Sequence, residues 1–159
     1  MTELTLFLLS LDAALLALGV YNLYWQAQID LRGNYAGFQV VMAALFAFWF
    51  LATGTPSILM VVFFAAFITL TVMSGTSGLA KTAVVSVGMV RRVLPYQKMT
   101  AISLTPLALP NGRELVVAVF GRSPRGFIRL TFKTDLQSLM ATLRPRVPES
   151  VPITIQQVQ

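Results

Sequence analysis

Residues 38–72 read FQVVMAALFAFWFLATGTPSILMVVFFAAFITLTV. The stretch contains two apolar runs without a formal charge, separated by a TGTP turn. Thr55 can cap a helix that starts at Pro56, because the N–H that proline lacks would have no helical partner there. The stretch therefore predicts a tight hairpin of two helices, over about 36–53 and 56–75, each able to cross a membrane.

A further apolar run precedes this hairpin, from about residue 4 to residue 24. At about 1.5 Å per residue it is long enough to cross a hydrocarbon core of roughly 30 Å. Because no basic residue precedes the run, we interpret it as a transmembrane helix and not as a cleaved signal peptide. The composition agrees, since 56% of the residues are hydrophobic and 11% are charged. The sequence thus predicts three transmembrane helices within residues 1–78.

The basic residues are divided unevenly along the chain. Eleven of the 12 Lys and Arg residues lie between Lys81 and Arg146, and only Arg32 lies before them. Loops on the cytoplasmic side of a membrane carry an excess of Lys and Arg. We therefore expect a multi-pass protein of the bacterial inner (plasma) membrane, with the N-terminus outside, Arg32 inside and a cytoplasmic C-terminal domain.

The second half of the chain changes to short segments rich in Val, Ile and Thr, which are typical of strands. Residues 127–132 alternate between two faces, as in a half-buried strand. A T-x-x-Q capping box at Thr134 predicts an amphipathic helix over 135–143. Residues 147–159 are expected to form a flexible tail. The expected fold is an α+β membrane protein, with three transmembrane helices followed by a small antiparallel β domain, residues 79–146, closed by one C-terminal helix.

Residues 88–104 read GMVRRVLPYQKMTAISL. They resemble the G-(apolar)-x-R…(apolar)-P-Y-x-K-(apolar)-x-x-I segment of bacterial membrane proteins with a pleckstrin-homology-like (PH-like) cytoplasmic domain. The resemblance covers about residues 80–145, and transmembrane helices precede the domain in those families too. It implies a PH-like fold and a membrane-proximal binding role, but no reaction. The predicted strands are fewer than the usual seven.

Asp12 is the most unusual residue of the apolar half, because an ionised carboxylate within an apolar helix costs several kcal/mol. The side chain needs a partner, a proton or water. One hypothesis is a proton or ion site, or a contact with a basic residue of a partner protein. The other is a neutral carboxyl bonded to Ser10 or Thr71. Small residues at four-residue spacing, such as Ser10 and Ala14, are compatible with helix packing or docking onto a partner.

Several basic side chains are candidate contacts for a partner protein or for lipid headgroups. They are Arg91, Arg92, Arg113, Arg122, Arg125 and Arg129. The alternative is that they face an anionic leaflet without a specific ligand. Nucleic-acid binding is not predicted, because no binding motif is recognised and Phe120, Phe127 and Phe132 are spaced like core residues.

The chain contains no cysteine and no histidine, which excludes thiolate and imidazole chemistry. Its six carboxylates form no evident pair, so no catalytic, cofactor or metal site is predicted. The sequence favours a nonenzymatic adaptor, regulator or accessory subunit that contacts membrane lipids and either a membrane-protein partner or further copies of itself. The alternative is a component of a membrane transport or ion pathway that uses Asp12.

Overall fold

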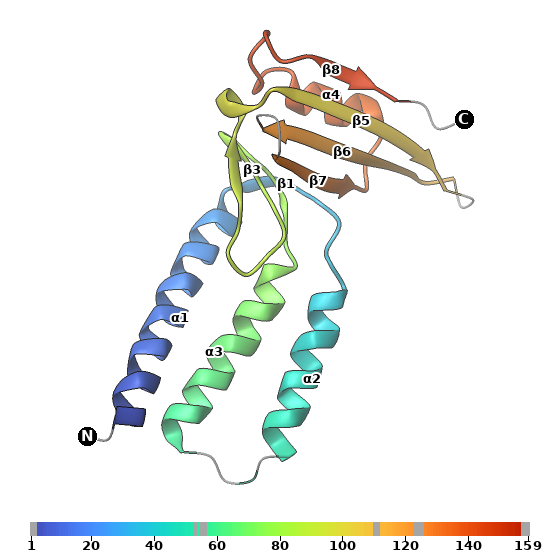
Figure 1. Cartoon of the computed structure of the whole chain (residues 1–159). Coiled ribbons are helices and arrows are strands. Elements are labelled where there is room, and N and C mark those ends of the chain that lie inside the picture. Colours follow the sequence, from blue (N-terminus) through green and yellow to red (C-terminus); the bar gives the residue numbers. More distant parts are fainter. Residues whose placement is uncertain (1–2, 53, 55–56, 110–111, 123–125, 157–159) are drawn as a thin grey trace. The chain divides into compact units, whose positions relative to one another are not determined.

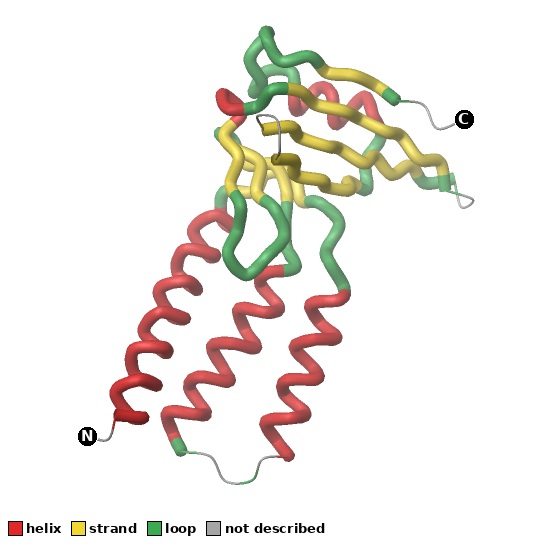
Figure 2. Tube along the Cα trace, viewed as in Figure 1, coloured by secondary structure: helices red, strands yellow, loops and turns green. Residues whose placement is uncertain are grey.

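The computed structural model describes residues 3–52, 54, 57–109, 112–122 and 126–156 (Figures 1 and 2). The chain divides into two compact units. The first, here called the helical unit, comprises Met1–Ala27, Tyr35–Gly75 and Val87–Arg91. The second, here called the sheet unit, comprises Gln28–Asn34, Thr76–Ser86 and Arg92–Gln159. The two units alternate along the sequence, whereas the sequence predicts a single boundary near residue 78.

Three apolar helices form the helical unit, and α3 lies between the other two (Figure 1). They are α1 (Glu3–Ala27), α2 (Phe38–Ala52) and α3 (Ile58–Ser74). Ser57 is the N-cap of α3, and its hydroxyl oxygen accepts the Met60 N–H at 3.4 Å. The predicted cap Thr55 and first residue Pro56 lie outside the described residues, as does Thr53.

The prediction of three transmembrane helices is wrong. In the described part of the chain, only α1 is long and apolar enough to cross a membrane, by length and composition. This helix has 25 residues, whereas α2 and α3 are shorter apolar helices of 15 and 17 residues. The two runs of the predicted hairpin therefore form helices, but neither reaches the length expected from the sequence.

The residues before α2 bind the end of α3 and do not extend α2. Tyr35 donates its hydroxyl to the Val72 carbonyl oxygen at 2.7 Å. The Ala36 N–H donates to the Gly75 carbonyl oxygen at 3.0 Å. The last carbonyl oxygens of a helix lack N–H partners from a following turn. The two bonds provide donors from the segment before α2 to carbonyl oxygens at the end of α3. The helix α2 therefore begins at Phe38, two residues later than predicted.

The sheet unit contains two four-stranded sheets, so the prediction of a single small β domain after the helices is also wrong. The first sheet is antiparallel, with strand order β1-β2-β3-β4. Its strands are β1 (Ile29–Arg32), β2 (Gly78–Ala80), β3 (Ala83–Val85) and β4 (Val93–Pro95). Strand β1 comes from the segment between α1 and α2, which the sequence presents as a loop.

The pairing of β1 with β2 depends on a close approach at Gly78. Leu31 pairs with Leu79 and Arg32 with Gly78, after a register shift that follows Ile29. A Cβ atom at Gly78 would collide with the Leu31 carbonyl oxygen and with the Ile29 side chain. Only glycine allows β1 to lie this close to β2.

The second sheet has strand order β7-β6-β5-β8. Its strands are β5 (Ala101–Ala108), β6 (Glu114–Arg122), β7 (Gly126–Phe132) and β8 (Ile153–Ile155). Strands β5, β6 and β7 are antiparallel, and β8 pairs with β5 in parallel. The segment predicted as a flexible tail thus supplies a strand, and Val147 and Val151 within it are buried. Residues 157–159 lie outside the described residues.

The apolar core of the sheet unit contains side chains from both sheets and from helix α4 (Leu136–Leu143). Phe120, Phe132, Leu139 and Leu143 are all fully buried in it. The predicted alternation along residues 127–132 and the predicted helix over 135–143 agree with β7 and α4. The N-cap of α4 is Asp135, one residue after the predicted Thr134.

Candidate functional site

The helical unit has an apolar outer face and buries several polar side chains beside apolar ones such as Phe64 and Leu70. Asp12, Asn22, Thr71 and Ser74 are each at most 5% exposed. Of the 26 large hydrophobic side chains that are exposed in the described structure, all but Phe127 and Ile155 lie in the helical unit. Soluble domains rarely expose a contiguous apolar surface of this extent, and such surfaces are typical of membrane or protein contacts.

Asp12 is buried without a hydrogen-bond partner. Both carboxylate oxygens are inaccessible to solvent, and neither bonds to any group in the described residues. The Ser10 hydroxyl donates to the Phe7 carbonyl oxygen at 2.7 Å, and the Thr71 hydroxyl donates to the Phe67 carbonyl oxygen at 2.8 Å. The hydrogen bond from Ser10 or Thr71 that one hypothesis required is therefore not formed.

A second buried polar feature is a set of hydrogen bonds between Asn22 of α1 and the loop Val87–Arg91. Arg91 donates from Nε to Asn22 Oδ1 at 2.5 Å and from Nη2 to the Met73 carbonyl oxygen at 2.8 Å. The Asn22 amide donates to the carbonyl oxygens of Leu18 at 2.9 Å and Met89 at 3.0 Å. Met73 lies in the last turn of α3, where a cation interacts favourably with the helix dipole. The loop is thus fastened to α1 and α3.

Arg91 is a candidate contact residue that the structure places inside the protein. Its side chain is 3% exposed. Burial lowers the pKa of its guanidinium below the ordinary value, and Tyr21 opposes this change. The sequence does not identify Asn22 as the partner of Arg91, because one amide in an apolar helix belongs to no recognisable motif. Its role depends on a residue 69 positions away.

The remaining basic candidates are exposed and lie apart from one another. Arg92 precedes β4, Arg113 lies between β5 and β6, Arg122 ends β6, and Arg129 lies within β7. Arg129 pairs with Val119, so alternation along β6 places Arg122 on the other face of the sheet. Arg122 and Arg129 therefore do not share one binding surface on this sheet. Arg125 lies outside the described residues.

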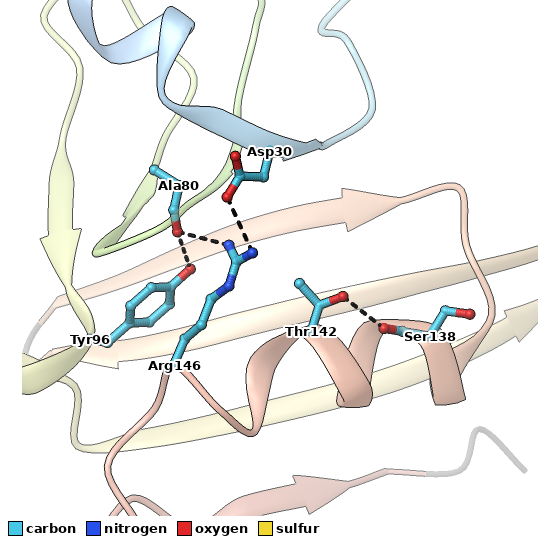
Figure 3. A network of polar contacts seen from close by, with 6 residues as sticks. All are labelled: Asp30, Ala80, Tyr96, Ser138, Thr142 and Arg146. Atoms are coloured by element: carbon cyan, nitrogen blue, oxygen red, sulfur yellow. Dashed lines mark hydrogen bonds and ion pairs between the residues drawn. The ribbon is translucent and has the colours of Figure 1, made fainter.

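A polar network in the sheet unit joins β1 to the segment after α4 (Figure 3). Arg146 forms an ion pair with Asp30 at 3.2 Å, and its Nη1 donates to the Ala80 carbonyl oxygen at 3.1 Å. The Tyr96 hydroxyl donates to the same oxygen at 2.8 Å. Burial raises the pKa of Tyr96, and the nearby Arg146 opposes this rise. The network joins β1, β2, the 3-10 turn Tyr96–Lys98 and the segment after α4.

Within the described ranges, no three His, Cys, Asp or Glu side chains come together as they would to hold a metal ion. Comparisons with protein-family models, with curated proteins and with solved structures give no match. The features that remain for a functional argument are the apolar outer face of the helical unit, the unsatisfied Asp12 and the basic surface of the sheet unit.

Proposed function

We propose that this protein is a nonenzymatic, membrane-anchored adaptor, regulator or accessory subunit. The helix α1 anchors it in the bilayer, and the sheet unit is its water-facing binding module. The observation that carries this proposal is the contrast between the two units. The helical unit exposes nearly all the large apolar side chains that are exposed in the described structure, whereas the sheet unit encloses most of its apolar side chains in a core.

In the proposed arrangement α1 crosses the inner membrane with its N-terminus outside. The sheet unit, which contains all the Lys and Arg residues except Arg91, lies on the cytoplasmic side. The apolar outer faces of α2 and α3 contact acyl chains or apolar surfaces of a partner. Each exposed base near an anionic leaflet contributes on the order of 1 kcal/mol of attraction. Because these bases lie on different faces, the attraction needs no specific headgroup pocket.

The sheet unit is further proposed to be a PH-like module. Two features support the resemblance in residues 88–104. Strands β1 to β7 supply seven antiparallel strands before α4, because β1 adds a strand that the sequence does not reveal. Helix α4 then packs on the core that both sheets share. Strand β8, parallel to β5, is an addition to the pattern that the resemblance implies.

Vesicle binding tests the proposed role of the sheet unit. The full chain is held in phosphatidylcholine nanodiscs and sedimented with vesicles of phosphatidylcholine alone or with added phosphatidylserine. We expect binding to the anionic vesicles only, weaker at high salt. A variant with Arg92, Arg113, Arg122 and Arg129 replaced by Gln should lose most of this binding. Equal binding to both kinds of vesicle, or full binding by the variant, would contradict the proposal.

A further inference from the structure

Strand β7 forms an open edge of the second sheet (Figure 1). One side of β7 pairs with β6, and no strand of the described chain pairs with its other side. That other side accepts one main-chain hydrogen bond, from the Asn34 N–H to the Thr131 carbonyl oxygen at 2.6 Å. The edge therefore already binds the backbone of another segment, but only near its C-terminal end.

The bond to Thr131 shows which backbone groups of β7 face the open edge. Along a strand, the N–H and C=O groups of alternate residues face the same side. Because the Thr131 carbonyl faces away from β6, the N–H and C=O groups of Phe127 and Arg129 also face the open edge. None of these groups has a hydrogen-bond partner in the part of the chain that the structure describes. An edge with such unpaired groups is a template for a further strand.

The side chains at this edge favour a particular kind of strand. Phe127 is 68% exposed, and Arg129 is exposed on the same face, while Ile128 between them is buried. Gly121 of β6 lies opposite Phe127, so no side chain from that position covers the ring. Arg129 lies opposite Val119 and forms no ion pair with a described residue. An apolar side chain and a carboxylate are the complements of these two exposed groups.

The charge of the sheet unit favours a foreign segment over a second copy of the chain. The unit contains 11 of the 12 Lys and Arg residues but only four of the six Asp and Glu residues. Strand β7 has one charged residue, Arg129, and no carboxylate. Pairing of two β7 strands would therefore bring two basic units together, whereas an acidic segment is attracted. Charged side chains on edge strands are a common means of preventing pairing between copies.

We propose that the β7 edge binds an extended acidic segment of a partner protein, which joins the sheet as an antiparallel strand. This inference rests on the proposed function as an adaptor and names the chemistry of its partner. Main-chain hydrogen bonds to Phe127 and Arg129 supply affinity, and the two side chains supply specificity. In an antiparallel strand, the partner residue opposite Arg129 precedes the one opposite Phe127 by two positions. The expected motif is Asp or Glu, then any residue, then an apolar residue such as Val.

Short peptides test this proposal. Each is capped at both ends and consists of Thr residues, except for Glu and Val at the two motif positions. The full chain is labelled with nitrogen-15 at phenylalanine and arginine and held in an uncharged detergent, and Kd values are read from the amide signals of Phe127 and Arg129. Two N-methylated peptides test the main-chain bonds. One carries its methyl groups on Glu and Val, whose N–H groups face β7, and the other carries them on Thr residues whose N–H groups face away.

We expect the Glu peptide to bind with a Kd roughly threefold lower than that of a matched Gln peptide, since an exposed ion pair contributes modestly. Arg129→Gln should give both peptides the same Kd. Arg144→Gln removes another exposed base of the sheet unit and should keep the threefold difference. N-methylation at Glu and Val should raise the Kd roughly tenfold, and N-methylation at the other positions should change it much less. Circular dichroism checks that both variants stay folded.

Equal Kd values for the Glu and Gln peptides with the natural chain would overturn the proposal, as would equal effects of the two N-methylations or an absence of binding. If Arg129→Gln then weakens sedimentation with anionic vesicles, Arg129 contacts the leaflet instead of a peptide. The uncharged detergent keeps the peptide result separate from the proposed function. A chain that fails to bind anionic vesicles can still bind the Glu peptide, and the reverse is equally possible.

Discussion

Arg91 and Asn22 form a side-chain hydrogen bond of 2.5 Å, although 69 residues separate them in the sequence. Asn22 belongs to α1, and Arg91 ends the loop that connects β3 to β4. The flanking residues Ser86 and Arg92 belong to the sheet unit and close the base of the loop through the Arg92 N–H and the Ser86 hydroxyl oxygen, 3.0 Å apart. The loop Val87–Arg91 therefore belongs to the helical unit, although the strands before and after it belong to the sheet unit.

Asn22→Ala should destabilise the helical unit strongly. The substitution removes the acceptor of the buried Arg91 and the donor to Met89, and unpaired buried polar groups are costly. We expect a loss of about 2–4 kcal/mol in the free energy of unfolding. Thermal unfolding in detergent measures it. Arg92→Ala changes the exposed neighbour and serves as the control, with an expected change within about 0.5 kcal/mol. Equal losses in the two variants would show that the buried bond does not hold the loop.

The ion pair between Arg146 and Asp30 should contribute little to the free energy of unfolding, despite its short distance. Their side chains are 23% and 38% exposed, so water screens the pair. We expect Asp30→Asn to cost less than about 1 kcal/mol and to lose even that effect at high salt. Arg146→Ala should cost more, because it also removes the hydrogen bond to the Ala80 carbonyl. Chemical denaturation compares the two variants, and a larger loss for Asp30→Asn would contradict this account.

Gly78→Ala should weaken the first sheet, because the added methyl group would collide with the Leu31 carbonyl oxygen. We expect a loss of roughly 1–3 kcal/mol, the usual cost of forcing an atom into a packed site. Gly37→Ala is the matched control, since no atom lies within 4 Å of a Cβ at that position. Hydrogen exchange of the β1 and β2 amides should increase in Gly78→Ala only. Unchanged exchange there would show that β1 does not require this close approach.

Because of Asp135, the stability of the folded chain should decrease at acidic pH. It is the N-cap of α4, and hydrogen bonds from the hydroxyl and N–H of Ser138 lower its pKa from the ordinary value of 3.8. The folded chain therefore binds this proton more weakly than the unfolded chain. The stabilisation is complete above the ordinary pKa and is lost as the pH falls through the lowered value.

Asp135→Asn keeps a capping oxygen but cannot titrate. The difference in Tm between the natural chain and this variant should therefore shrink as the pH falls from about 6 to about 2. Thermal unfolding followed by circular dichroism measures the difference. A constant difference over this range would mean that the charge of Asp135 does not contribute to the cap.

The sequence predicts the elements whose signal is local. Helix α4 follows from its apolar period and from polar residues at its start, although Asp135 and not Thr134 is the cap. Strand β7 follows from its alternation. Strand β1 escapes prediction because four residues between two apolar helices become a strand only through pairing with β2, about 50 residues later. The lengths of α2 and α3 escape it for a similar reason, since Tyr35 and Ala36 bond to the end of α3.

In the candidate site too, the sequence predicts local features but not contacts between distant residues. Asp12 is recognisable from the sequence, because a carboxylate within an apolar run is costly wherever it points. Its lack of a partner is visible only in three dimensions, where Ser10 and Thr71 bond to their own helices. The sequence suggests that Arg91 is a contact residue for a partner or for lipid, whereas its burial against Asn22 depends on the path of one loop. Sequence thus identifies unusual residue types, whereas their partners require the fold.

The most direct test of the proposed membrane anchor uses the protein's own fluorescence. Both tryptophans, Trp25 and Trp49, lie in the helical unit, and Trp25 lies near the end of α1, the proposed anchor. In a Trp49→Phe chain reconstituted into vesicles, the emission of Trp25 is recorded with lipids brominated on the acyl chain near the headgroup and, separately, with aqueous iodide. We predict strong quenching by the brominated lipids and little by iodide, because tryptophan at the end of a membrane-crossing helix lies at the level of the lipid interface. Quenching by iodide without quenching by the brominated lipids would contradict the membrane anchor.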